Sequence, residues 1–212
     1  MNMQQPDLVI LASSSPRRQQ FLHELGLSFL VVSPDLSEDQ LPNEKPDDYV
    51  RRVASDKARA SLERYIQRPD AVADCLVIAA DTSVVVGEHT LGKPVDEADA
   101  LDMLRRLSGR VHQVMTGLCL LRRRAPHPVT EKVLHVVTDV LFKQLTDAEI
   151  RSYVRSGSPF DKAGGYGIQD RAGTMIHSIN GSYTNVVGLP MTELADELAA
   201  QSRNLKDVLD HK

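Results

Sequence analysis

Several positively charged side chains in this sequence could together bind an anion such as a polyphosphate. One group is the segment Ser13–Arg18, a serine-rich turn between an apolar strand pattern and a helix start. Hydroxyls and the free N–H groups at a helix N-terminus can hold phosphate oxygens. Arg17 and Arg18 stand where helices favour acidic residues, so they fit a bound anion as well as they fit two solvated side chains.

Two further charged residues lie where an apolar side chain would be expected. Asp81 follows the apolar run Val77–Ala80 and is predicted to lie at the carboxyl end of a central strand, where ligands gather in open α/β sheets. Its carboxylate could bind Mg²⁺, orient a water molecule or cap the next turn. Lys57 falls on the apolar stripe of a predicted helix. It either snorkels to solvent, which the local pattern favours, or points at an anion in a cleft.

Two loops carry further polar side chains that could contact a nucleotide. Lys93 lies between Gly92 and Pro94 and could reach a phosphate, although most such lysines are plain surface residues. Gln169 ends a glycine-rich segment, and its amide could both donate to and accept from the edge of a base. The sequence contains neither a P-loop nor a dinucleotide-binding glycine pattern, and its histidines lack metal-ligand spacing. His112 is therefore predicted to be structural.

The elements that must position these residues alternate between strand and helix patterns, which predicts an α/β fold. Apolar patterns predict strands over 8–11, 27–33, 77–86, 111–121, 136–145 and 175–179. Helices are predicted over 15–26, 47–65 and 96–107, from a capping box at Thr146 to Gly157, and from Pro190 onward. The segment 122–135 is predicted to be an exposed loop, and 204–212 a polar tail that frays.

Composition excludes several classes of protein. The chain of 212 residues has a formal net charge of −4, so it lacks the basic field that binds long nucleic acid. The N-terminus Met1–Asp7 is polar, which argues against a signal peptide, and no apolar run approaches the ~20 residues of a membrane span. Cys75 and Cys119 lie among apolar residues and are expected to be reduced, buried thiols. We therefore expect a cytoplasmic protein that contacts neither membrane nor long nucleic acid.

These motifs, taken together and in order, resemble the Maf family of nucleotide pyrophosphatases. The resemblance extends from about Leu8 to Leu198 and predicts one domain over 1–212 with its core at 8–198. The matching segments are Leu11–Arg18, Ala80–Thr82, Gly92–Pro94, Leu107–Gly109 with His112, Thr116-Gly117, Asp161–Gln169 and Asn185–Pro190.

The resemblance implies an α/β fold like that of inosine triphosphate pyrophosphatase. It would have a mixed twisted sheet, flanking helices and two lobes around a central cleft. It also implies hydrolysis of a nucleoside triphosphate to the monophosphate and pyrophosphate with a divalent metal, Mg²⁺ or Mn²⁺. Asp81 matches the family's proton acceptor and could instead bind the metal, together with Glu38. The substrate-binding residues would be Ser13, Arg17, Arg18, Lys57 and Lys93.

Thr82 and Gln169 resemble the branch of the family that acts on dTTP and UTP, and with Arg17 they would be the specificity positions. Three alternatives stay open. One is activity on 7-methyl-GTP, the substrate of another branch, and another is a sensor that binds nucleotide without turnover. The third is a non-enzymatic regulator of cell division, because the family has been linked with inhibition of septum formation. A homodimer is a further expectation.

Overall fold

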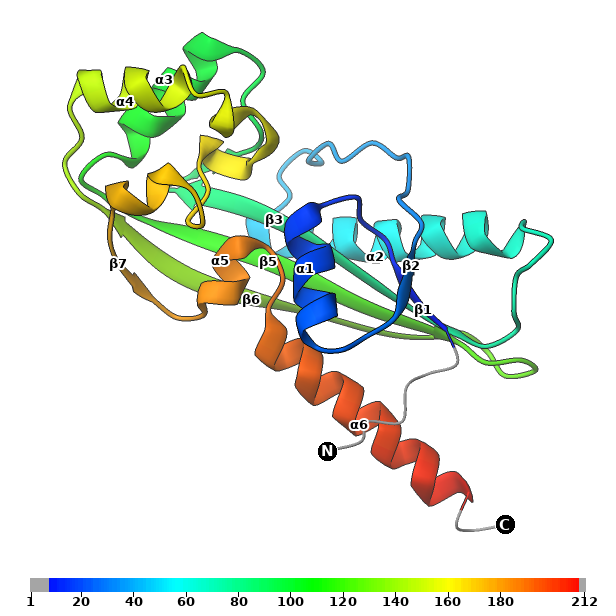
Figure 1. The fold of residues 1–212 in the computed structure, drawn as a ribbon. Coiled ribbons are helices and arrows are strands. Elements are labelled where there is room, and N and C mark those ends of the chain that lie inside the picture. Colours follow the sequence, from blue (N-terminus) through cyan, green and yellow to red (C-terminus); the bar gives the residue numbers. More distant parts are fainter. Residues whose placement is uncertain (1–7, 210–212) are drawn as a thin grey trace.

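A twisted, mixed sheet of seven strands forms the centre of the molecule, in the order β2-β1-β3-β5-β6-β7 with β4 paired to β3 (Figure 1). The computed structural model describes residues 8–209, and side chains as far as Gln201. Strands β1, β2 and β3 are parallel and all other pairs are antiparallel. The strands are β1 (Val9–Leu11), β2 (Phe29–Val31), β3 (Cys75–Val86), β4 (His89–Leu91), β5 (Val111–Arg123), β6 (Thr130–Phe142) and β7 (Ile176–Asn180).

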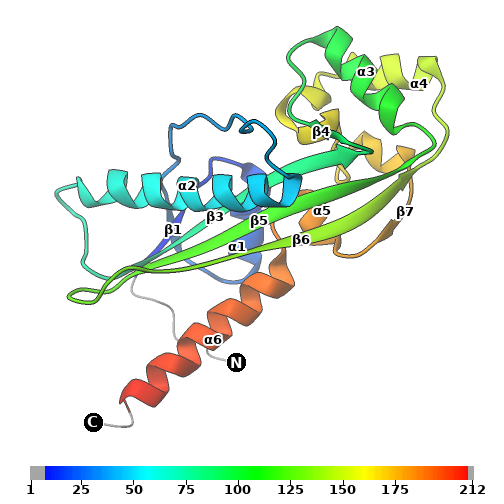
Figure 2. The ribbon, with the colours of Figure 1, turned by 180° about the vertical axis from the view of Figure 1, so that it is seen from behind.

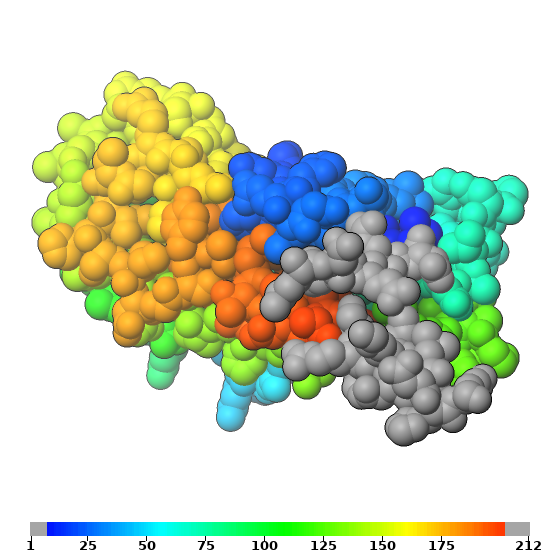
Figure 3. Space-filling model, turned by 60° about the horizontal axis from the view of Figure 1, so that its bottom comes forward, coloured from blue at the N-terminus to red at the C-terminus, as the bar shows by residue number. Residues whose placement is uncertain are grey.

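Helices cover both faces of the sheet, so successive residues of β3 point into different cores. Leu76, Ile78 and Ala80 pack in the core that holds α1 (Pro16–Glu24) and α6 (Met191–Leu209). Val77 and Ala79 pack in the core of the other face, under α2 (Pro46–Ile66). Figure 1 shows α1 and α6 on the near face, and Figure 2 shows α2 on the opposite one. In Figure 3 the surfaces of α1 and α6 adjoin, and both helices bury leucines in one core.

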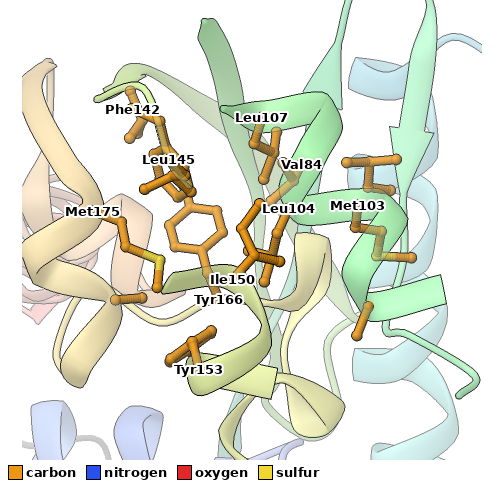
Figure 4. Close-up of a cluster of buried hydrophobic side chains, with 14 of the residues drawn as sticks. Val84, Met103, Leu104, Leu107, Phe142, Leu145, Ile150, Tyr153, Tyr166 and Met175 are labelled. Carbon is orange, nitrogen blue, oxygen red and sulfur yellow. The ribbon is translucent and has the colours of Figure 1, made fainter. Parts of the chain in front are cut away.

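A smaller lobe lies at one end of the sheet and contains α3 (Glu97–Leu107), α4 (Asp147–Val154) and three 3₁₀ segments at 158–161, 163–165 and 171–175. Its core packs Leu104, Phe142, Tyr153 and Tyr166 together (Figure 4). The capping box predicted at Thr146 is confirmed at the start of α4.

The predicted structural role of His112 fits this lobe. The side chain is 1% exposed, and its Nε2 lies 2.7 Å from the Tyr166 hydroxyl. Burial lowers the pKa of His112 to about 4. The imidazole is therefore neutral near pH 7 and packs as an aromatic ring against Phe142.

The predicted exposed loop 122–135 is wrong in its extent. Strands β5 and β6 continue into it and pair as far as Arg122 with Thr130, so that only 124–129 connect them. The charged residues of β6 face solvent, which gives this strand the composition of a loop. The short elements β4 and α5 (Tyr183–Val187) were not predicted, because neither is long enough to display a periodicity.

The expectation of two buried thiols is confirmed. Cys75 and Cys119 are buried free thiols. None of the helices within 8–209 combines the length and the apolar composition that crossing a membrane requires. The predicted polar tail overlaps α6, which continues to Leu209, while Met1–Asp7 and 210–212 lie outside the described residues.

Candidate active site

The sequence-predicted site residues converge on one cavity of about 740 Å³ between the sheet and the smaller lobe. Arg17, Lys57 and Lys93, which lie far apart in the sequence, all line this cavity together with Asp81. Since these groups come from α1, α2, a loop and β3, their convergence is a product of the fold. The predicted residues at the cavity are Ser13, Arg17, Arg18, Glu38, Lys57, Asp81, Thr82, Lys93 and Gln169.

A buried ion pair lies at the floor of the cavity on the α2 face of β3. Lys57 Nζ lies 2.7 Å from Asp81 Oδ1 and 2.8 Å from Glu38 Oε2. Lys57 is 7% exposed and Asp81 is 5% exposed, so the expectation that Lys57 snorkels to solvent is wrong. The second carboxylate oxygen of Asp81, Oδ2, is buried and has no hydrogen-bond partner among the described residues. That oxygen can therefore accept a proton or bind a cation.

The position of Asp81 differs from the prediction. It lies within β3, which continues to Val86, and not at the strand's carboxyl end. The adjacent strand β1 ends at Leu11 opposite Ile78, so Asp81 lies beyond the carboxyl end of β1, where the cavity opens. On the other side of β3, Asp81 pairs with Gly117, at which an added Cβ would lie 2.1 Å from the Val50 carbonyl oxygen. The absence of a side chain at Gly117 lets α2 pack directly against the sheet beside Asp81.

The turn before α1 supplies a serine hydroxyl and two arginines. Ser15 occupies the N-cap position as predicted, but its side chain makes no capping hydrogen bond, and the first turn contains no acidic residue. The Ser13 hydroxyl accepts hydrogen bonds from the Ser15 N–H and from Arg18 Nη1, each at 3.2 Å. The helix N-terminus therefore keeps its positive potential toward the cavity.

The two arginines have different surroundings. Arg17 forms an ion pair of 3.2 Å with Asp161 of the smaller lobe. Within the part of the chain that the structure describes, Arg18 contacts only neutral acceptors: besides Ser13 Oγ, Nε donates to the Gly188 carbonyl at 2.8 Å, and Nη2 donates to Thr82 Oγ1 at 3.2 Å. Burial lowers the pKa of Arg18 from its ordinary value, against the opposing effect of Asp81 and Glu38. Arg18 is thus a fixed cation that contacts no carboxylate among the described residues.

Two loops complete the rim. Gly164 has φ of 66° and donates its N–H to the Gly92 carbonyl at 2.9 Å, which ties the glycine-rich segment to the loop that carries Lys93. Lys93 is exposed at the cavity and forms no ion pair within the described residues. Gln169 is also exposed, and none of the hydrogen bonds within the described residues holds its amide.

Sequence reasoning gave no site role to other residues of the cavity, among them Tyr49, Asp170 and Asp161, although Asp161 begins one of the matching segments. Tyr49 donates its hydroxyl to the Glu38 carbonyl at 2.8 Å, and burial raises its pKa to about 12. Asp170 accepts hydrogen bonds from the Ser158 and Tyr153 hydroxyls. The position of Asp170 directly after Gln169 was an available signal, whereas nothing in the local pattern separates Tyr49 from a packing residue.

A cavity that gathers cations around a buried carboxylate, beyond the end of a parallel strand, defines an α/β protein built to bind a polyanion. The model of the Maf-like protein family matches residues 8–201. The chain belongs to the Maf family.

Its relatives include curated enzymes of similar length. A dTTP/UTP pyrophosphatase of Geobacter sp. (strain M21) is 46% identical over 90% of this chain and 93% of its own. A dTTP/UTP pyrophosphatase of Anaeromyxobacter dehalogenans (strain 2CP-C) is 48% identical over 88% and 90%. Among solved structures, a nucleoside-triphosphatase / dITP/XTP pyrophosphatase of Mycobacterium abscessus aligns over 94% of this chain and 96% of its own at a TM-score of 0.40 and 15% identity.

Proposed function

We propose that this protein hydrolyses dTTP and UTP between the α- and β-phosphates, releasing the nucleoside monophosphate and pyrophosphate. The observation that carries the proposal is the convergence of Arg17, Arg18, Lys57 and Lys93 on the cavity that holds Asp81. Cations placed in advance stabilise the charge that builds on phosphate oxygens during cleavage, without a cost of reorganisation. The names of the similar enzymes support dTTP and UTP as the substrates.

Asp81 is the group that would prepare water for attack. Lys57 holds Oδ1 and so fixes the plane of the carboxylate, while Oδ2 is left without a partner in the described part of the chain. A general base must lie within hydrogen-bond reach of the proton that it removes, so this role requires a water molecule to bind beside Oδ2 where Asp81 lines the cavity. The attacking water would donate one proton to Oδ2 as its oxygen bonds to phosphorus, while the bridging P–O bond between the α- and β-phosphates breaks and pyrophosphate leaves.

The carboxylates of Glu38 and Asp81 would hold Mg²⁺ or Mn²⁺. No group of three or more candidate metal ligands occurs among the residues with described side chains. Mg²⁺ is usually bound through one or two carboxylates together with substrate phosphates and water, so two carboxylates fit such an ion. In that case the unpartnered Oδ2 of Asp81 would bind the ion instead of accepting a proton, since Lys57 already holds Oδ1. When bound, the ion would neutralise negative charge on the phosphate oxygens.

Arg17, Thr82 and Gln169 would select the base. The amide of Gln169 could pair with the O4 and N3–H edge that uracil and thymine share, whereas cytosine presents the opposite donor pattern. An amide can rotate to suit either edge, so discrimination requires other groups of the site to be fixed. Equal hydrolysis of CTP and UTP would count against this assignment.

A panel of triphosphates tests the proposal. The panel contains dTTP, UTP, CTP, ATP, GTP and 7-methyl-GTP, each with Mg²⁺ or Mn²⁺, and pyrophosphate release is measured. The expected result is fastest release from UTP and dTTP. Preference for 7-methyl-GTP would assign the protein to the other branch of the family. No pyrophosphate release from any triphosphate of the panel would favour a sensor or a regulator of cell division. The cytoplasmic location and the homodimer stay predictions, the latter checked by sedimentation.

A further inference from the structure

Three buried side chains behind the cavity connect Thr82 to α5, and the proposed mechanism uses none of them. Thr116, Thr138 and Asn185 are each 0% exposed. Buried hydroxyls and amides cost free energy unless they are hydrogen-bonded, so such a cluster is not a default choice for a core. Its location on the face of β3 opposite Lys57 separates it from the buried ion pair.

The direction of every hydroxyl proton along this cluster is determined. Thr116 Oγ1 lies 3.0 Å from the Asn185 carbonyl oxygen, which can only accept, so Thr116 donates its single proton there. In the 3.0 Å contact between Thr82 and Thr116, the donor must therefore be Thr82. Since its proton is committed, Thr82 Oγ1 accepts from Arg18 Nη2 at 3.2 Å. The chain of hydrogen bonds runs from Arg18 through Thr82 and Thr116 to α5.

Asn185 anchors the far end of this chain. Its Nδ2 donates to the Val114 carbonyl of β5 at 3.0 Å and to Thr138 Oγ1 of β6 at 2.9 Å. Because a carbonyl cannot donate, the bond to Val114 also fixes which side of the amide carries the nitrogen. Asn185 thereby holds α5 against the sheet, and Gly188, just after α5, accepts from Arg18 Nε at 2.8 Å.

The cluster thus holds in place two of the three neutral acceptors that Arg18 has among the described residues, namely Thr82 Oγ1 and the Gly188 carbonyl. A guanidinium carries five N–H donors, so those not used here remain for an anion. Arg18 is thus oriented by neutral groups and contacts no carboxylate among the described residues, so its charge is held in a fixed place for a phosphate.

We infer that Thr116 and Asn185 are positioning residues of this site. They fix Arg18 for a polyphosphate, and because the Thr82 proton is donated to Thr116, Thr82 can only accept a hydrogen bond from a ligand. The second part rests on the proposed function. The oxygen of Thr82 can accept from the N3–H of uracil or thymine. It has no proton to offer to the bare N3 of cytosine. Thr82 would then provide a fixed hydrogen-bond acceptor for the base, which Gln169 does not provide because its amide can rotate.

Four variants test the inference: Thr116→Val, Thr116→Ser, Thr82→Val and the double variant Thr82→Val with Thr116→Val. Valine has the shape of threonine without the hydroxyl, and serine restores the hydroxyl. The Asn185 carbonyl still accepts from the Gly188 N–H at 3.0 Å, so Thr116→Val leaves no carbonyl there without a partner. Pyrophosphate affinity is measured by calorimetry, and kcat/KM is measured for UTP and for CTP.

The expected loss of pyrophosphate affinity in Thr116→Val is about fivefold, the effect of one net hydrogen bond, with recovery in Thr116→Ser. The double variant should bind no more weakly than Thr82→Val, because both changes break the same chain. The ratio of kcat/KM for UTP to that for CTP should also fall about fivefold in Thr116→Val.

Wild-type pyrophosphate affinity in Thr116→Val, or additive losses in the double variant, would overturn the inference. An unchanged UTP to CTP ratio would overturn the acceptor role of Thr82. A wild-type protein inactive on UTP would refute the proposed function instead, and the pyrophosphate measurements would still decide on Thr116.

Discussion

Asp81 and Thr82 are neighbours in β3, yet they point to opposite faces of the sheet and into clusters of opposite character. On the α2 face, Lys57 contacts two carboxylates, and Asp81 Oδ2 lacks a partner among the described residues. On the α5 face, Thr82 and Thr116 belong to a neutral chain in which each hydroxyl proton has its acceptor. We propose a different role for each face: the charged face would perform the chemistry, and the neutral face would orient groups for it.

Removal of Lys57 should have the largest effect on stability. Lys57→Met leaves the buried Asp81 carboxylate uncompensated, and breaking a buried pair in this way costs about 3–5 kcal/mol in the free energy of unfolding. Urea denaturation measures the loss. The matched control is the double variant with Asp81→Asn, which should recover much of the stability. A single variant within ~1 kcal/mol of wild type would mean that the pair behaves like an exposed salt bridge.

Asp81→Asn alone should separate chemistry from binding. The amide keeps the shape of the carboxylate but is a far weaker base, so UTP turnover should fall by ~10²–10³, the usual loss on removing one such group. Pyrophosphate affinity, measured by calorimetry, should stay close to that of wild type because the cations remain. Near-normal turnover would exclude the proposed role and place the chemistry elsewhere in the cavity.

His112 belongs to neither of the two clusters, and its burial should make the free energy of unfolding depend on pH. Its pKa is lowered by burial from 6.5 to about 4, so between these pH values the imidazole is protonated in the unfolded chain and neutral in the folded chain. His112 therefore costs no stability above pH 6.5, and the free energy of unfolding should fall as the pH drops toward 4, by about 3 kcal/mol at most.

Urea denaturation at a series of pH values measures this fall. His112→Gln should flatten the dependence over that range, whereas replacing the exposed His89 by Gln should leave it in place. If the free energy of unfolding of His112→Gln depended on pH as it does in the wild-type protein, other groups, such as those of the charged face, would cause the acid sensitivity.

The smallest effect is expected at the far end of the neutral cluster. Thr138→Val removes the acceptor of Asn185 Nδ2 and should lower the free energy of unfolding by about 1–2 kcal/mol. Its kcat on UTP should change far less than in Asp81→Asn, because Thr138 touches no group that reacts. A loss of kcat as large as that of Asp81→Asn would contradict the division between the two faces.

The sequence revealed the charged face better than the neutral one. Lys57 on an apolar stripe and Asp81 after an apolar run are visible because charge interrupts a hydrophobic pattern. That these two residues pair could not be predicted, because it depends on the close packing of α2 at Gly117. Thr116 and Asn185 carry no charge, and an isolated threonine or asparagine is common in any element.

Errors in the predicted elements have similar physical causes. The strands at 122–135 were hidden because the exposed, polar start of β6 has the composition of a loop. Asp81 was placed at a strand end because aspartate usually ends a strand, whereas β3 continues along its antiparallel partner β5. The α/β fold, the flanking helices and the residues of the cavity were nevertheless predictable, because apolar periodicity and a set of ordered motifs specify them.

The most direct test of the account is the identity of the products that the wild-type protein forms from UTP with Mg²⁺. Phosphorus NMR distinguishes cleavage between the α- and β-phosphates from loss of the terminal phosphate. The account predicts UMP and pyrophosphate in equal amounts, with release ~10²–10³-fold slower in a parallel sample of Asp81→Asn. The appearance of UDP with inorganic phosphate, or UTP left intact by the wild-type protein, would contradict it.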